Sequence, residues 1–377
     1  MGMVHIAIAV LGAISIGLSA WAWRRDVPLD WRFAVPPVVV PQGAPRFETV
    51  FDYEATEGQA HSPAIEVTGD GFSILWFEGS EEAQADVDIF AADFTPASEG
   101  WQASAPRRRV TRSALGDAFE PRQLVVTLGN TIQNEGVPGG LYATVVSVGG
   151  WAMASVADVR MRGGAPARAR KLDLSPLLNR SFLVKSPMLA YADGSRGLPA
   201  YFEMGNTFAA LVRFAPDGRV RDRRRMPGRL NAIQPMIVPL DEARAVAFMR
   251  NFASGAQRLL VSRTGDGGRS WSEVAETDMP NPSAPVAALS LGGDRILMAA
   301  NDDPDKADIL RLILSEDGGR TWRRLATLED AGGDATRAAR YPMLRRMGDG
   351  RIVLTYSIGT KRGIRAHVFN DAWVAAR

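Results

Sequence analysis

The stretch that decides the fold occurs twice, as Thr264-Gly-Asp-Gly-Gly-Arg-Ser-Trp271 and as Ser315-Glu-Asp-Gly-Gly-Arg-Thr-Trp322. The two copies are 51 residues apart, counted from Asp266 to Asp317, and each follows an apolar run of strand composition. In each copy the aspartate can accept hydrogen bonds from backbone N–H groups and the glycines can adopt positive φ, which is the chemistry of a tight turn between strands. A strand-rich repeat of about 50 residues is typical of propeller blades or of a solenoid.

Both copies resemble the Asp-box of sialidases and related BNR-repeat proteins, in which the box is a structural hairpin at the edge of a blade. The resemblance to the predicted neuraminidases of this family continues along most of the chain. It rests on His61-Ser-Pro-Ala-Ile65, Leu75-Trp-Phe-Glu-Gly-Ser-Glu81, Val146-Ser-Val-Gly-Gly-Trp151, Leu198-Pro-Ala-Tyr-Phe-Glu203 and Tyr341-Pro342. It implies a six-bladed β-propeller and gives the conspicuous box residues a structural role.

The remaining sequence favours one large all-β domain. The 377 residues include 37 glycines and 23 prolines, and short apolar runs such as Ser73-Ile-Leu-Trp-Phe77 and Ile352-Val-Leu-Thr-Tyr356 recur between turn signals. Such runs have the length and composition of strands, and no long amphipathic helix is evident in this part of the sequence. We therefore predict an all-β, six-bladed, sialidase-like propeller over residues 46–377, with about 55 residues in each blade.

An apolar segment precedes this domain. Residues 4–23 carry no Lys, Arg, Asp or Glu, and His5 is the only strongly polar side chain among them. This suits a membrane-spanning helix or a long signal-peptide core, so we predict an anchor or uncleaved signal over residues 1–23 and a proline-rich linker over residues 24–45. The two arginines that follow favour a cytoplasmic body by the positive-inside rule. The family resemblance instead implies the periplasmic or extracytoplasmic side, which we prefer.

Composition excludes several classes of function. The 44 basic residues nearly balance the 42 acidic residues, which argues against a dedicated nucleic-acid binder. The chain has no cysteine and only three histidines, so thiol chemistry, disulfides and a multi-histidine zinc site are excluded. We expect no metal and no cofactor. The arginine runs at 107–109 and 221–225 suit an anionic polysaccharide or lipid headgroups, or are solvated turns.

The resemblance to sialidases also implies a set of site residues. That reaction uses cationic groups that hold a carboxylate, a tyrosine nucleophile with a glutamate beside it, and an acid for the leaving group. Tyr341 falls where the nucleophile is expected, Asp86 where the acid is expected, and Arg250 at one arginine of the clamp. Each also has a structural interpretation; Tyr341, for example, could be an aromatic residue at the start of a strand.

Other positions depart from the sialidase pattern. His61 and Lys306 fall where two further arginines are expected, and Gln234, which cannot take a proton, falls where the activating glutamate is expected. Glu203 or Glu81 could replace that base if the fold brings either one to the tyrosine. The candidate residues are Tyr341, Asp86 and Glu203 for catalysis, and His61, Arg250, Gln234, Lys306, Glu81 and Asn301 for substrate binding.

We therefore predict a glycan-directed propeller, tethered to a membrane through its N-terminal helix or exported. Its expected activity is that of an exo-glycosidase on a terminal sugar of a surface or extracellular polysaccharide, other than ordinary sialic acid. The alternatives are a non-catalytic protein for glycan binding or polysaccharide assembly, and a protein-interaction propeller. A carboxylate within hydrogen-bond reach of Tyr341 Oη would favour catalysis, because an unassisted phenol with a pKa of about 10 stays protonated.

Overall fold

The computed structural model describes residues 2–25, 28–35, 37–55, 57–175, 179–255, 257–304 and 308–377. It divides into an N-terminal unit, Met1–Asp30, and a compact unit, Trp31–Arg377. The N-terminal unit contains helix α1 (Met3–Arg25), and its segment Met3–Trp23 is long and apolar enough to cross a membrane. The expected N-terminal apolar helix is thus confirmed, and it fits a signal peptide or an anchor.

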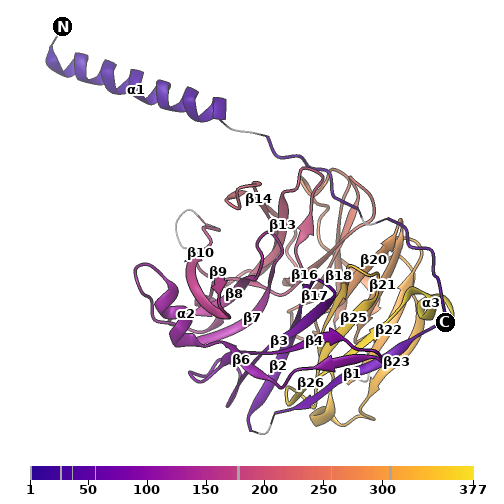
Figure 1. The fold of residues 1–377 in the computed structure, drawn as a ribbon. Coiled ribbons are helices and arrows are strands. Elements are labelled where there is room, and N and C mark those ends of the chain that lie inside the picture. Colours follow the sequence, from indigo (N-terminus) through magenta and orange to yellow (C-terminus); the bar gives the residue numbers. More distant parts are fainter. Residues whose placement is uncertain are drawn as a thin grey trace. The chain divides into compact units, whose positions relative to one another are not determined.

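The compact unit is a six-bladed β-propeller, as predicted (Figure 1). Each blade is an antiparallel sheet, and the strands at its inner edge contact those of the neighbouring blades near the centre of the ring. Blade 1 contains β2 (Gln59–Thr68), β3 (Gly71–Gly79), β4 (Asp88–Pro96), β5 (Trp101–Ala103) and β6 (Arg107–Val110), where β5 and β6 both pair with β4. Blade 2 contains β7 (Thr127–Asn134), β8 (Gly140–Val146), β9 (Ser155–Arg162) and β10 (Ala165–Lys171). Blade 3 contains β11 (Phe182–Val184), β12 (Leu189–Ala190), β13 (Arg196–Phe202), β14 (Phe208–Phe214) and β15 (Val220–Arg225).

The second half of the chain forms the other three blades. Blade 4 contains β16 (Ala232–Pro239), β17 (Ala245–Asn251), β18 (Arg258–Thr264) and β19 (Ala275–Pro280). Blade 5 contains β20 (Ala287–Gly292), β21 (Arg295–Ala300), β22 (Ile309–Ser315) and β23 (Arg323–Asp330). Blade 6 contains β24 (Arg340–Arg346), β25 (Ile352–Ile358), β26 (Gly363–Phe369) and, as its outermost strand, β1 (Phe47–Glu54). Two short helices, α2 (Arg112–Ala118) and α3 (Asp371–Ala375), lie outside the sheets.

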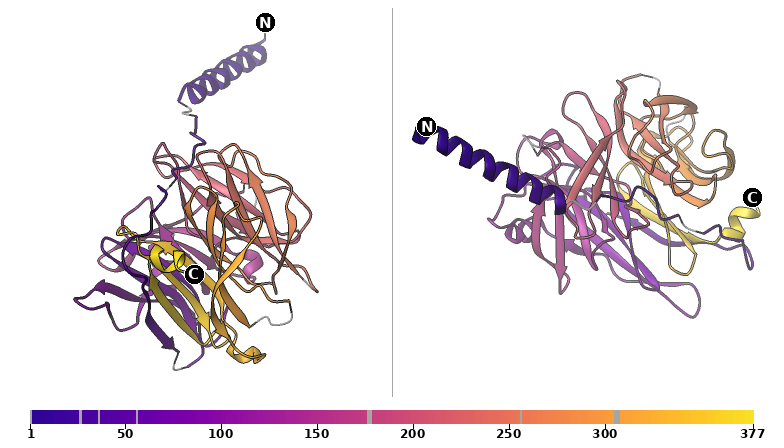
Figure 2. Two further views of the ribbon diagram at one scale, coloured as in Figure 1. Left: turned by 90° about the vertical axis from the view of Figure 1, so that its right-hand side faces the viewer. Right: turned by 90° about the horizontal axis from the view of Figure 1, so that it is seen from above.

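Blade 6 closes the ring, because it combines both ends of the propeller sequence. Strand β1 pairs antiparallel with β26, from Phe47 opposite Phe369 to Glu54 opposite Gly363, and these strands lie side by side in Figures 1 and 2. Phe47 stacks on Phe369 with ring centroids 5.4 Å apart. A chain that starts and ends in one sheet cannot open without breaking that sheet.

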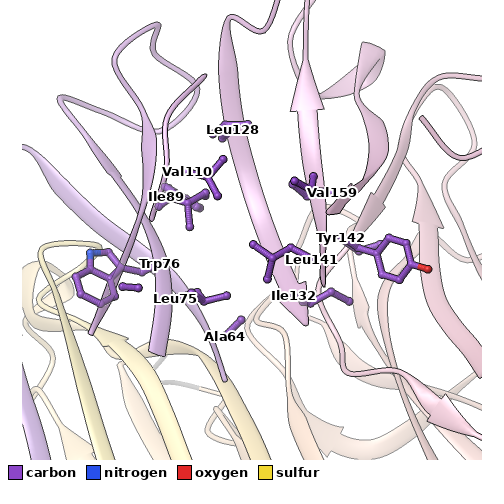
Figure 3. Close-up of a cluster of buried hydrophobic side chains, with 14 of the residues drawn as sticks. Ala64, Leu75, Trp76, Ile89, Val110, Leu128, Ile132, Leu141, Tyr142 and Val159 are labelled. Carbon is purple, nitrogen blue, oxygen red and sulfur yellow. The ribbon is translucent and has the colours of Figure 1, made fainter. Parts of the chain in front are cut away.

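The core lies between the faces of adjacent blades. Inner strands are buried on both faces; all seven residues of β8 are buried, whereas the outer strand β1 has no buried residue. Between blades 1 and 2, side chains such as Leu75 and Ile89 face Leu128 and Leu141 (Figure 3). Strands covered on both sides need apolar residues at nearly every position, which explains the uninterrupted apolar runs in the sequence.

The two Asp-boxes form the turns between the third and fourth strands of blades 4 and 5. In the first, Asp266 accepts hydrogen bonds from Ser270 N at 2.9 Å and from Ser270 Oγ at 2.6 Å. In the second, Asp317 accepts the same two bonds from Thr321, at 2.9 and 2.6 Å. Burial alone would raise the pKa of these carboxyls, but the hydrogen bonds hold each pKa below its usual value. The boxes are therefore structural turns.

Residues 31–35, here called the N-terminal strap, pack against blades 3 and 4. Phe33 is 1% exposed, lies 5.0 Å from the Tyr191 ring and donates its N–H to Glu242 O at 2.8 Å. The compact unit therefore begins at Trp31, earlier than the predicted start near Arg46. The prolines nearby indicated a linker, but the two aromatic residues of the strap supply enough apolar surface to hold it on the propeller.

The strap gives a test that compares the two boxes. A Cβ added at Gly267 (φ +75°) would lie 1.5 Å from Trp31 O, whereas one at Gly318 (φ +72°) would meet only a leucine methyl at 3.2 Å. Both substitutions to alanine carry a backbone cost of about 1 kcal/mol. We expect Gly267→Ala to reduce the free energy of unfolding by a further 1–3 kcal/mol, roughly the cost of overpacking. Denaturant unfolding of the two variants measures this difference, and equal losses would mean that the strap does not contact the box.

Candidate functional site

The first strands of several blades are bent at equivalent places. The ladders of β2, β7, β16 and β24 each contain a register shift at this point. Ser62, Gln234 and Tyr341 lie in three of these bends with φ of 54°, 54° and 59°, and each precedes a proline. Positive φ costs a residue other than glycine of order 1 kcal/mol or more. Such a repeated cost, at the inner strands, points to a shared functional position.

A cavity of about 440 Å³ lies at these bends. A cavity of this size can hold a small organic ligand, and side chains from five of the six blades meet in it. Its wall contains five of the candidate residues, namely Tyr341, Glu203, Arg250, Gln234 and Glu81. The remaining lining residues are Phe77, Glu82, Gly129, Asn130, Trp151, Leu183, Tyr201, Phe252 and Lys361.

Arg250 and Tyr341 form the best-defined pair in the cavity. Arg250, at the end of β17, donates from Nη1 to Tyr341 Oη at 3.1 Å and from Nε to Ser283 Oγ at 3.0 Å. Ser283 in turn donates to Asn251 O at 3.0 Å. The guanidinium is thus held in place by two hydroxyl groups rather than by a carboxylate, and it can still bind an anionic group of a ligand.

His61 supports this pair from below and does not line the cavity. It is 2% exposed, and its ring lies edge-on to Tyr341 and Phe77 with centroids 4.3 and 5.3 Å apart. Burial lowers the pKa of His61 well below its usual value, and the charges of nearby lysines and arginines lower it further. The ring is therefore neutral at physiological pH. It can position Tyr341, but it cannot replace a clamping arginine as a cation.

Glu203 is the half-buried carboxyl of the cavity. Burial raises its pKa, Arg250 opposes that effect, and the neighbouring Glu82 adds to it. A carboxyl with a raised pKa retains its proton to higher pH and is suited to act as an acid. Glu81 lines the same cavity but is exposed. Among the described residues, no carboxylate is hydrogen-bonded to Tyr341 Oη.

Gln234 lies where a base was expected from the resemblance. It is 4% exposed, and its Oε1 has no hydrogen-bond partner among the described residues. The pKa of Tyr201, which lines the same cavity, is raised well above the usual value by burial and further by the charge of Glu203. Tyr201 therefore stays protonated, and the Gln234 oxygen can accept a hydrogen bond from a ligand.

Besides His61, the structure places two more of the described candidates, Asp86 and Asn301, outside the cavity lining. Asp86 is exposed and accepts hydrogen bonds from Ser80 N and Oγ at 2.9 and 3.0 Å. Although slight burial raises its pKa, these bonds hold it below the usual value, so Asp86 is ionised and poorly suited to donate a proton. Asn301 is fully buried and donates to Ile309 O and Ala339 O at 2.8 and 3.0 Å. Lys306 lies outside the described residues.

Sequence reasoning missed Lys185, which lies beneath the cavity. It is 3% exposed, and Nζ donates to Pro342 O at 2.7 Å, one residue after Tyr341. Burial lowers its pKa to about 7. A signal was present, because Lys185 is a charge at the end of the apolar run Phe182-Leu-Val, as Arg250 is in its own strand. Within the described part of the chain, no cluster of three or more acidic or histidine side chains could hold a metal.

The ring of blades and its polar central cavity define a sialidase-like β-propeller. The chain belongs to the BNR repeat-like domain family, whose model matches residues 70–354. Three solved structures illustrate the likeness. "Hadza microbial sialidase Hz136" is 14% identical, with a TM-score of 0.61 over 82% of this chain and 65% of that chain. The Trypanosoma rangeli sialidase in complex with the inhibitor DANA is 12% identical, with a TM-score of 0.61 over 88% and 61%. A protein of unknown function from Dyadobacter fermentans is 11% identical, with a TM-score of 0.58 over 85% and 98%.

At these identities the likeness concerns the fold. The chain spans less than two thirds of the length of the two sialidases, 65% and 61% respectively. No curated protein is significantly similar to it in sequence. The fold and the family together support a glycosidase-like or glycan-binding role.

The buried lysine predicts an unusual pH dependence of stability. Between about pH 7 and about pH 10, the folded chain carries a neutral Lys185 while the unfolded chain binds a proton there. By linkage, this lysine makes stability rise with pH across that window, by up to ~1.4 kcal/mol per pH unit. We expect the free energy of unfolding of wild type to increase relative to that of Lys185→Met over this range. A constant difference between the two would contradict a neutral amine.

Proposed function

We propose that the central cavity binds a terminal acidic sugar of a polysaccharide and that the protein hydrolyses the glycosidic bond of that sugar on the extracytoplasmic side. The observation that carries this proposal is the raised pKa of Glu203 in the same cavity as the Arg250–Tyr341 pair. A site that only holds an anion gains nothing from a half-buried carboxyl, which repels the ligand whenever it is ionised. Hydrolysis, in contrast, requires a proton donor beside the leaving oxygen.

The clamp favours an anion but is not that of an ordinary sialidase. Arg250 offers its guanidinium to a sugar carboxylate, since charge-assisted bonds of this kind are strong. Lys361 lines the same cavity, but its ammonium is paired with Glu82. The aromatic rings of Trp151 and Phe252 provide apolar surface for a sugar ring. Among the described residues that line the cavity, Arg250 is the one cation without an ion-pair partner. One such cation gives less specificity than three arginines, which supports a substrate other than ordinary sialic acid.

Glu203 and Tyr341 have separate roles in the proposed cleavage. Glu203 donates its proton to the glycosidic oxygen as the bond from that oxygen to the anomeric carbon breaks. Tyr341 Oη stabilises the positive charge that develops on the sugar. Water then bonds to the anomeric carbon and returns a proton to Glu203, which restores the acid. Direct attack by Tyr341 would need a base for the phenolic proton, and Gln234 cannot be that base.

Binding without cleavage is the second candidate. Two observations favour it, namely the glutamine at the expected base and the bond from Tyr341 Oη to a guanidinium rather than to a carboxylate. In that case the same cavity would recognise the end of a glycan, and Glu203 would contribute a hydrogen bond.

Replacing the acid separates the two candidates. For hydrolysis, we expect Glu203→Gln to reduce turnover by about 100- to 10,000-fold, the usual contribution of a general acid, without loss of glycan binding. Wild-type activity should fall as pH rises through the raised pKa of Glu203, and the variant should lack this fall. Turnover and binding are scored separately on a panel of acidic and deoxy-sugar glycans. Glu99→Gln, at an exposed glutamate outside the cavity, is the matched control.

If no glycan in that panel is cleaved by wild type and several are bound, the protein is a glycan-binding protein. If Glu203→Gln keeps wild-type turnover, Glu203 is not the acid.

The role of Tyr341 is tested by removing one oxygen atom. We expect Tyr341→Phe to lower turnover by at least about tenfold, because Oη is the group assigned to the charge that develops in the transition state. Tyr53→Phe is the control, since Tyr53 Oη bonds to Glu78 at 3.0 Å outside the cavity. Unchanged turnover of every cleaved glycan in Tyr341→Phe would remove this residue from the mechanism.

A further inference from the structure

The outermost strands of the six blades differ sharply in charge. Strand β6 contains three arginines and no acidic residue, β10 contains two arginines and a lysine, and β15 contains four arginines and one aspartate. The corresponding strands of blades 4 and 6 are acidic, since β19 has two acidic residues and β1 has three, and neither has a basic one. On β23 the charges cancel. Basic side chains are therefore gathered on the outer edges of three consecutive blades.

The guanidinium groups on these strands are held against the surface. Arg108 lies over the Phe90 ring at 5.5 Å, and Arg225 lies over the Phe208 ring at 4.3 Å. Arg107 pairs with Asp93 at 2.6 Å, yet its side chain remains 44% exposed. Arginines whose stems rest on apolar rings lose less conformational freedom when they bind an anion.

Blades 1 and 2 are joined across their outer edges by α2. Strands β6 and β10 lie in contact with each other, and α2 packs against β10 (Figure 1). A cavity of about 390 Å³ lies at α2, and its lining includes Arg112 and Arg122. Arg122 is 75% exposed and pairs with Asp117 at 2.5 Å. This junction therefore has basic side chains at a hollow in the surface.

Blades 2 and 3 are joined by an arginine. Arg170, on β10, donates to Gly218 O in the turn before β15 at 3.1 Å. The edges of blades 1, 2 and 3 thus form one continuous surface, which we call the basic arc. It comprises β6, α2, β10 and β15.

We propose that the basic arc binds a linear anionic polysaccharide along the outside of the propeller, at a second site separate from the central cavity. Three consecutive blades of a six-bladed ring turn through about 120°. A flexible chain can follow such a curve and contact all three edges at once. A flat bilayer can lie against at most two of them, so the observations favour a chain over a membrane.

The choice of a polysaccharide over a nucleic acid rests on the proposed glycan-directed function. One observation on the arc supports it. Proteins that bind single strands offer aromatic rings on which bases stack, whereas Phe90 and Phe208 are covered by arginines here. A structural role also has to be weighed, because charged side chains on an edge strand prevent pairing with other sheets. That role requires basic or acidic residues equally, and it does not explain why only one half of the ring is basic.

The test measures binding by the full-length chain in an uncharged detergent. The probes are heparin and alginate chains of defined length, which carry sulfate and uronate groups respectively. We expect each paired substitution, Arg107→Gln with Arg108→Gln, Arg168→Gln with Arg170→Gln, and Arg221→Gln with Arg225→Gln, to weaken binding of long chains by about fivefold or more. The losses should combine across blades, and binding should weaken with salt. A short oligosaccharide should bind far more weakly than a long chain.

The matched control is Arg323→Gln with Arg324→Gln, two adjacent exposed arginines on β23 of blade 5. We expect this variant to bind the long chains as wild type does. We also expect variants with lysine in place of the arc arginines to keep binding them. Losses equal to those of the control, or unchanged polysaccharide binding in all three arc variants, would overturn the proposal. So would arc-dependent binding of bicelles containing phosphatidylserine, or of single-stranded DNA, in place of the polysaccharides.

A failure of the proposed binding site on the basic arc can be told apart from a failure of the function proposed for the central cavity. Arg250→Gln, which removes the guanidinium that holds an anionic group in the central cavity, should bind the long chains as wild type does, because Arg250 lies in that cavity and not on the arc. A change of affinity in this variant would mean that the chains bind in the central cavity, which overturns the separate site but leaves the proposed activity in place.

Discussion

The pairing of β1 with β26 is the interaction on which the rest of the structure depends. It joins residues about 320 positions apart into one sheet, and the central cavity exists only because that sheet closes the ring. Glu81, Asn130, Glu203, Arg250 and Tyr341 come from five different blades and have no local reason to meet.

Polar groups beside the paired strands β1 and β26 strengthen this closure of the ring. His367 bonds to Thr49 Oγ1 at 3.0 Å and to Tyr356 Oη at 2.7 Å, and burial lowers the pKa of His367 to about 4. This histidine therefore joins β1, β25 and β26 as a neutral hydrogen-bonding group.

The fold could be predicted from the sequence because the Asp-box is a local motif. Asp317 accepts its hydrogen bonds from Thr321 in the same hairpin. The motif can therefore be recognised without knowledge of the rest of the chain. The number of blades followed from the spacing of the boxes and the family resemblance. The strap was not foreseen, because its contact with Gly267 joins segments far apart in the chain, and proline content is a weak guide to whether a segment is folded.

The site was only partly predictable, for a related reason. Arg250 stood out as a charge at the end of an apolar strand, and the same pattern at Lys185 was overlooked. Asp86 was chosen from its place in a motif, but hydrogen bonds from the neighbouring Ser80 decide what it can do. Whether a side chain points inward depends on bends at the inner strands, and periodicity alone does not encode those bends. The charge states of His61 and Lys185 were even harder to predict from the sequence, since their low pKa values come from burial by other blades.

The bends at Ser62, Gln234 and Tyr341 have a consequence for how such a protein changes over time. Each places one side chain at the axis while the proline that follows it resumes the strand. Because the backbone path is set by the bend, the side chain at the bend can be exchanged without shifting the register of the blade. The bends are therefore positions at which side chains can differ while the arrangement of the blades stays the same. A substitution at one of these bends can change the chemistry of the centre while the architecture stays the same.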